Sequence, residues 1–190
     1  MPDLTEQLEA ERIASYIKLK GGFPVLFAGA TYWGSLTVLG YTSGAPLWHY
    51  VALFGSGAIF PLALFYARIF RNDFTKERTS VTGVFLPAFV SMLLFWPMAI
   101  AALWQAIELF PLILAIGLSL HFPVIGWSYA KTFLYSSHAV IRAIVVFVIW
   151  WQFPQDRLTL LPLAVMLTYL VTAFIVIIDS QRTAKRSRQS

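Results

Sequence analysis

Three basic side chains, His121, His138 and Arg142, lie inside apolar stretches of this 190-residue sequence, and the remaining histidine, His49, lies near the outer end of such a stretch. His138 precedes Arg142 by four residues, so the two side chains share one face if the segment is helical. No Asp or Glu lies in the apolar stretches. Positive groups without carboxylates are suited to bind a phosphate, a carboxylate or a lipid headgroup. We therefore expect a site for an anionic or amphipathic ligand, formed by His121, Trp127, Tyr129, His138 and Arg142.

Each polar residue of this predicted site also has an ordinary structural interpretation. An arginine about one and a half turns inside a membrane helix usually extends its guanidinium to the interface. A histidine inside the bundle usually hydrogen-bonds to a neighbouring helix. Both alternatives stay open at this stage.

Signatures of enzymes and metal sites are missing from the sequence. The three histidines are too far apart for the spacing of metal ligands. No acid follows the adjacent Ser137 and His138 to orient the imidazole, and no Gly-rich phosphate loop occurs. We therefore expect no catalytic residue, no metal and no cofactor.

The elements that must position these residues are apolar helices. The sequence is 58% hydrophobic and 12% charged, whereas a soluble domain has about 25% charged residues. The apolar residues fall into runs of about 20, the length that crosses a bilayer as a helix. This pattern predicts an all-α fold, a polytopic transmembrane helical bundle, and disfavours a soluble enzyme, a nucleic-acid-binding protein and a disordered chain. Six spans are expected, at about 22–40, 47–67, 82–104, 109–129, 137–153 and 159–178.

Prolines inside three of these spans predict helix kinks at Pro61, Pro97 and Pro123. A proline inside a helix removes one backbone hydrogen bond and frees carbonyls that neighbouring groups must satisfy. Such kinks either shape the bundle or line a cavity.

A charged N-terminal segment precedes the spans. Asp3 and Glu6 favour the start of a helix, and Lys18 and Lys20 favour its end before Gly21. We expect residues 1–21 to form an amphipathic helix in the cytoplasm or at the interface. Residues 22–178 would then form the six-helix transmembrane domain, and residues 179–190 a basic cytoplasmic tail.

The distribution of basic residues predicts the topology. Of the fourteen Lys and Arg residues, all but Arg157 fall in segments on one side of a six-span arrangement. The positive-inside rule makes this side cytoplasmic, with both termini on it. The net charge of +5 therefore reports topology, and we expect no nucleic-acid partner.

Three short motifs carry a resemblance to a known family. They are Gly22-Phe23-Pro24 leading into Trp33, then Phe60-Pro61-Leu62-Ala63, and then His121-Phe122-Pro123 through Gly126-Trp127 to Tyr129. In these motifs the sequence resembles a family of short bacterial six-span membrane proteins, a domain of unknown function. The resemblance implies a bacterial inner-membrane location and no particular activity.

Two classes of function remain open from the sequence. One is a small permease or a membrane protein that binds a lipid or an anionic ligand. The other is a non-catalytic membrane scaffold or accessory subunit that binds a protein partner. In both classes we expect contact with membrane lipids, including anionic headgroups at the cytoplasmic face. The sequence leaves a protein partner and a homo-oligomer undetermined.

Overall fold

The computed structural model describes residues 3–72 and 79–189 of the chain, and their regular structure is entirely helical. Six helical segments in these ranges are long and apolar enough to cross a membrane, at Lys20–Thr42, Ala45–Ile69, Val81–Gln105, Ile107–Ser128, Thr132–Gln152 and Arg157–Ser187. The predicted all-α bundle with six spans is therefore confirmed. The protein is a multi-pass membrane protein.

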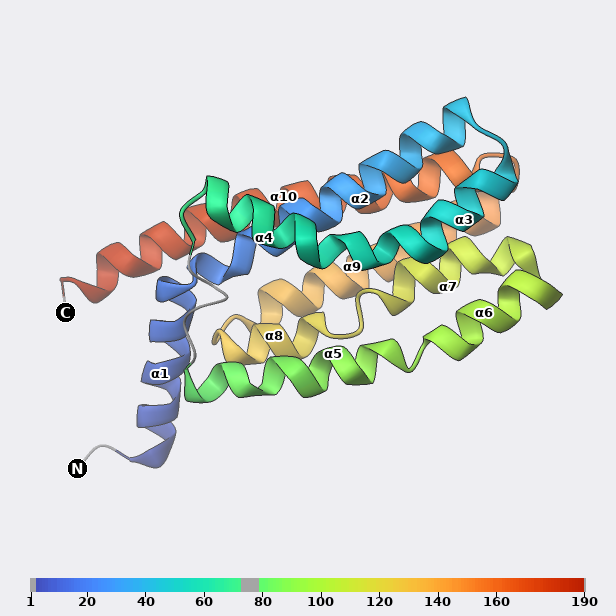
Figure 1. Ribbon diagram of the computed structural model, residues 1–190. Helices are drawn as coiled ribbons and strands as arrows, with labels where there is room; N and C mark the ends of the chain where they lie inside the picture. The colour runs from blue at the N-terminus through green and yellow to red at the C-terminus, as the bar shows by residue number, and fades with distance from the viewer. Residues whose placement is uncertain (1–2, 73–78, 190) are drawn as a thin grey trace.

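Ten α-helices make up the described part of the chain (Figure 1). They are α1 (Leu4–Lys18), α2 (Phe23–Thr42), α3 (Ala45–Gly55), α4 (Ile59–Ile69), α5 (Phe85–Leu93), α6 (Trp96–Gln105), α7 (Phe110–Gly117), α8 (Phe122–Ser128), α9 (Thr132–Gln152) and α10 (Arg157–Ser187). Four short 3₁₀ turns, at Lys20–Gly22, Ser56–Ala58, Ser80–Val84 and Ile107–Leu109, connect or extend them.

The second, third and fourth spans are each divided into two helices, whereas α2, α9 and α10 cross as single helices. Pro61 is the third residue of α4, and Pro97 and Pro123 are the second residues of α6 and α8. Proline suits the first turn of a helix because its fixed φ is helical and its missing N–H has no intrahelical acceptor there. Pro162, which the sequence analysis did not single out, lies inside α10 without dividing it.

The unbroken helices form the centre of the bundle. α2 packs along α10, α9 packs against α10 and α8, and α7 lies against α9 and α10. The helices α3 and α4 pack onto α2 from one side, and α5 and α6 contact α8 and α7 from another (Figure 1). The second and third spans are mostly exposed, so their apolar faces are available to surrounding lipid.

The ends of the bundle differ in their connections. In Figure 1 the links between α2 and α3, between α6 and α7, and between α9 and α10 lie at one end, and both termini lie at the other. α1 turns away from α2 at Lys20, Gly21 and Gly22, which all have positive φ. At Gly21 a side chain would also meet Val176 at 2.4 Å and Tyr16 at 2.8 Å, so this close approach requires glycine.

One boundary differs from the sequence prediction. The fifth span was expected to begin at residue 137, but α9 begins at Thr132, so residues that follow it lie deeper in the bundle than expected. The predicted basic tail begins at residue 179, where the chain is still helical; α10 continues to Ser187 because neither Gly nor Pro follows Pro162.

Candidate functional site

Arg142 lies at the middle of the fifth span and is completely buried. Ten residues of α9 precede it and ten follow it, which places it roughly 15 Å from each end at 1.5 Å per residue. The hydrocarbon core of a bilayer is about 30 Å thick. The side chain is 0% exposed, so its guanidinium does not extend to the interface.

The guanidinium of Arg142 is held between two aromatic rings. Its Cζ lies 5.3 Å from the ring centre of Trp33 on α2 and 5.1 Å from that of Tyr169 on α10. Its three nitrogens are buried without a hydrogen-bond partner in the described part of the chain, and so is Nε1 of Trp33. All four nitrogens are donors only. This part of the core therefore presents hydrogen-bond donors that lack acceptors.

His138 lies one helical turn before Arg142 and is also buried, at 3% exposure. Its Nδ1 is 2.8 Å from the hydroxyl of Thr172, which itself donates to the carbonyl of Thr168 at 2.8 Å. Nδ1 therefore donates to Thr172, and in the neutral ring Nε2 is an acceptor. Nε2 is buried and has no partner among residues 3–72 and 79–189.

His121 lies at the break between α7 and α8, at 7% exposure. The rings of His121 and His138 lie 4.7 Å and 4.3 Å from the ring of Phe122, and His138 is 4.9 Å from Tyr169. The described residues offer no hydrogen-bond partner to the buried Nδ1 of His121. We call the resulting group the Arg142 cluster; it consists of Trp33, His121, Phe122, His138, Arg142 and Tyr169.

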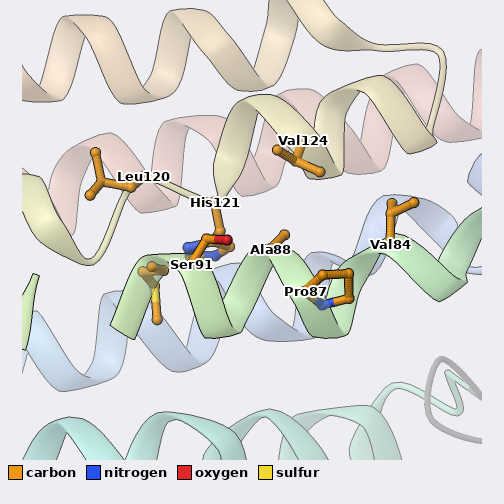
Figure 2. Close-up of a pocket in the computed structure, with 8 residues that line it drawn as sticks. Val84, Pro87, Ala88, Ser91, Leu120, His121 and Val124 are labelled. Atoms are coloured by element: carbon orange, nitrogen blue, oxygen red, sulfur yellow. The ribbon is translucent and has the colours of Figure 1, made fainter. Parts of the chain in front are cut away.

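Two cavities adjoin the Arg142 cluster and share His121 and Met92. The smaller, of about 300 Å³, lies between α5 and the break before α8, and Figure 2 shows Ala88 and Ser91 of α5 on one side with His121 and Val124 on the other. The larger cavity, of about 430 Å³, lies between the second span and the third span, at the level where each is divided into two helices. Its lining comprises Val25, Ser56, Gly57, Ile59, Phe60, Ala63, Phe89, Met92, Leu93, Trp96, Leu118, His121, Phe122 and Tyr169.

The structure brings together three of the five residues predicted for the ligand site and places the other two elsewhere. Trp127 is 41% exposed, and Cζ of Arg12 lies 4.7 Å from the centre of its ring. Tyr129 is buried against Tyr16, with ring centres 5.7 Å apart. Both contacts come from α1, which folds back onto α8, a long-range packing that local sequence patterns do not encode.

Tyr129 lies instead beside a polar contact that Tyr16 of α1 and Lys131 make with Asp179 of α10. Asp179 pairs with Lys131 at 2.7 Å and accepts a hydrogen bond from the Tyr16 hydroxyl at 2.9 Å. Burial, together with the neighbouring Asp179 carboxylate, raises the pKa of the Tyr16 hydroxyl, which therefore stays protonated and donates. This contact fastens α1 to the membrane domain and is separate from the Arg142 cluster.

Trp33, Tyr169 and Thr172 are members or neighbours of the site that were not predicted from the sequence. A signal was present, because Trp33 and Tyr169 lie inside apolar runs, whereas Trp and Tyr in membrane helices gather at the interfaces. Tyr169 and Thr172 are also three residues apart and so share one face of α10. No group of three or more His, Asp or Glu residues in the described ranges is arranged to hold a metal ion.

The sequence matches a known family model. The model of a family of unknown function, DUF7010, matches residues 8–179, in agreement with the resemblance seen in the sequence motifs. Neither the curated proteins nor the solved structures give a match. Because the family model covers most of the sequence and the six spans together, the chain belongs to this family of unknown function, DUF7010.

Proposed function

We propose that this protein binds an anionic group, a phosphate or a carboxylate, at Arg142 in the middle of the membrane, as a small permease or a lipid-binding protein. The observation that carries the proposal is the fully buried guanidinium, to which residues 3–72 and 79–189 offer no hydrogen-bond acceptor. An uncompensated buried charge costs about 3–5 kcal/mol, and an intramembrane ionisable residue is generally functional. An anion would supply both the missing charge and the missing acceptors.

Binding, and not catalysis, is the role that the Arg142 cluster supports. Catalysis by an imidazole needs a nucleophile beside it and commonly a carboxylate to orient it. His138 contacts the hydroxyl of Thr172, but this hydroxyl donates to the carbonyl of Thr168. His121 is surrounded by the rings of Phe89 and Phe122.

The proposed location is a bacterial cytoplasmic membrane, with both termini in the cytoplasm. Of the basic residues that the structure describes, all except Arg142 and Arg157 belong to segments at the end of the bundle that carries both termini, and the short uncharged or weakly charged connectors lie at the other end (Figure 1). This asymmetry supports the orientation through the positive-inside rule. Single cysteines at Ser43, Ile107 and Asp156 in this Cys-free chain should react with an impermeant thiol reagent from outside, and one at Arg182 should not. Labelling of Arg182→Cys and of none of the other three variants would show that the orientation is the reverse of the proposed one.

Ligand-induced stabilisation tests the proposed anion site. The full chain, reconstituted in nanodiscs of zwitterionic lipid, is melted with inorganic phosphate, acetate, palmitate, lysophosphatidate or phosphatidylglycerol. We expect at least one of these anions to raise the Tm of the wild-type protein and of Arg157→Gln, but not of Arg142→Gln. Arg157 is the matched control because it also lies over an aromatic ring, that of Trp150, but near the end of a span.

Equal shifts in the wild-type protein and Arg142→Gln, for every anion, would refute the anion site. The remaining candidate would then be a non-catalytic accessory subunit that binds a protein partner through the exposed faces of the second and third spans. Co-purification of such a partner with both proteins would support that alternative.

A further inference from the structure

We infer that the ligand is a single-chain amphiphilic anion whose acyl chain lies in the 430 Å³ cavity and whose headgroup meets His121 and Arg142. The inference rests on the proposed function and specifies its ligand class. We call this cavity the lateral groove, with the lining given above. Three observations support it: where the groove opens, what lines it, and how it reaches the guanidinium.

The lateral groove opens at the depth of Arg142. The 3₁₀ turn around Gly57 lies at the middle of the second span, and the break before α6 lies at the middle of the third. Between them, Gly57, Phe60 and Leu93 line the groove and are exposed. The exposed faces of these two spans face lipid, so a molecule dissolved in the bilayer can enter sideways without crossing a polar layer.

The lining of the lateral groove suits an acyl chain. Apart from Ser56, His121 and Tyr169, its lining side chains are apolar. A small hydrophilic anion would have to leave water to reach this depth, whereas each buried methylene of an amphiphile contributes about 0.8 kcal/mol to partitioning. A cavity of about 430 Å³ is at the lower end of the range of about 300–1,000 Å³ for pockets that hold one small ligand. The size of the groove therefore favours a single acyl chain.

The polar end of the lateral groove leads to the Arg142 cluster. His121 lines the groove, and its buried Nδ1 has no partner within the described residues. The ring of Tyr169 also lines the groove and at the same time lies 5.1 Å from Cζ of Arg142. A headgroup beside His121 is therefore separated from the guanidinium by the Tyr169 ring. A rotation of the Tyr169 side chain would let the anion take the place of this ring beside the guanidinium.

The lateral groove can be filled without disturbing the fold. Gly57 lines it, and no heavy atom lies within 4 Å of the position where its Cβ would be. A phenylalanine at this position occupies the space of the acyl chain. Gly83 has equally open surroundings but lies outside the groove. Gly83→Phe is therefore the matched control.

Native mass spectrometry of the nanodisc-reconstituted chain measures the dissociation constants of palmitate, lysophosphatidate, acetate, inorganic phosphate and hexadecanol. We expect palmitate or lysophosphatidate to bind at least tenfold more tightly to the wild-type protein and Gly83→Phe than to Gly57→Phe and Arg142→Gln. The unliganded Gly57→Phe and Gly83→Phe variants should melt near the wild-type temperature. Hexadecanol, which lacks a charge, should bind equally to the wild-type protein and Arg142→Gln. The more strongly binding of the two long-chain anions identifies the headgroup as carboxylate or phosphate.

Three outcomes would overturn the inference. In the first, acetate or phosphate binds as tightly as the long-chain anions, and this binding is lost in Arg142→Gln but kept in Gly57→Phe. The ligand then has no acyl chain in the groove, although the proposed anion site stands. If long-chain anions bind equally to Gly57→Phe and Gly83→Phe, the chain lies elsewhere. If no anion binds in an Arg142-dependent manner, the proposed function fails as well.

Discussion

Replacing Arg142 by methionine should stabilise the protein in the absence of ligand. Arg142 has no hydrogen-bond partner among the described residues and is fully buried. Methionine keeps an unbranched, flexible side chain of similar reach and removes the charge and the five N–H donors. Residues retained for binding are often destabilising in the empty protein, so their removal raises stability and abolishes function.

The magnitude follows from the contacts that the guanidinium makes and lacks. The two ring contacts, at 5.3 Å to Trp33 and 5.1 Å to Tyr169, approach the outer limit of cation–π attraction and contribute about 1 kcal/mol each. Leaving a buried charge without compensation costs about 3–5 kcal/mol. The expected net gain in the free energy of unfolding is therefore about 1–3 kcal/mol. For a chain of this length, 1 kcal/mol corresponds to roughly 2–4 °C in Tm.

Unfolding in nanodiscs of zwitterionic lipid, without added anion, provides the assay. Arg157→Met is the control, because Nε of Arg157 donates to the carbonyl of Trp150 at 2.8 Å and its removal should lower stability slightly. A loss of more than about 2 kcal/mol in Arg142→Met would refute the reasoning, since the guanidinium would then be compensated by bound water or another acceptor.

Two further predictions concern contacts outside the Arg142 cluster. Asp179→Asn removes the ion pair with Lys131 at 2.7 Å. Because the pair is partly exposed, the free energy of unfolding should fall by less than about 1 kcal/mol, and this effect should vanish in 1 M salt. A loss of stability that persists in salt would contradict this prediction. Gly40→Ala places a Cβ 2.2 Å from the carbonyl oxygen of Leu158, a backbone atom that cannot easily move, and should cost about 1–3 kcal/mol. Gly83→Ala, with open surroundings, should be neutral in the same melting experiment, and equal effects of the two alanines would show that α2 and α10 do not pack this closely.

The positions of the helix breaks show how far local sequence reasoning reaches. Pro61, Pro97 and Pro123 each lie in the first turn of the second half of a span. Proline acts on its own backbone and on the preceding turn, so its effect is visible in the sequence. Pro162 has the same chemistry, yet α10 continues through it. Whether a proline divides a helix or is absorbed by it therefore depends on the neighbours that satisfy the freed carbonyl.

The candidate site shows what local sequence reasoning does not predict. His138 and Arg142 were placed on one face because helical spacing is local. The assignment of Trp127 and Tyr129 to the same site was wrong in space, because α1 returns to cover both residues. Trp33 and Tyr169, which hold the guanidinium, come from the first and last spans. Such contacts depend on which helices pack together, and the hydropathy of each segment does not predict that pairing.

The sequence by itself determined the membrane class, the six spans and the presence of positive groups without carboxylates inside them, because length, hydropathy and charge are properties of each segment alone. Only the tertiary structure decided that Arg142 lies at mid-depth between α2 and α10, beside a groove open to lipid and without a hydrogen-bond partner in the described part of the chain. The physical reason is that compensation of a buried charge depends on atoms brought together from distant segments. The packing of α2, α9 and α10 supplies aromatic rings to this guanidinium and no acceptor.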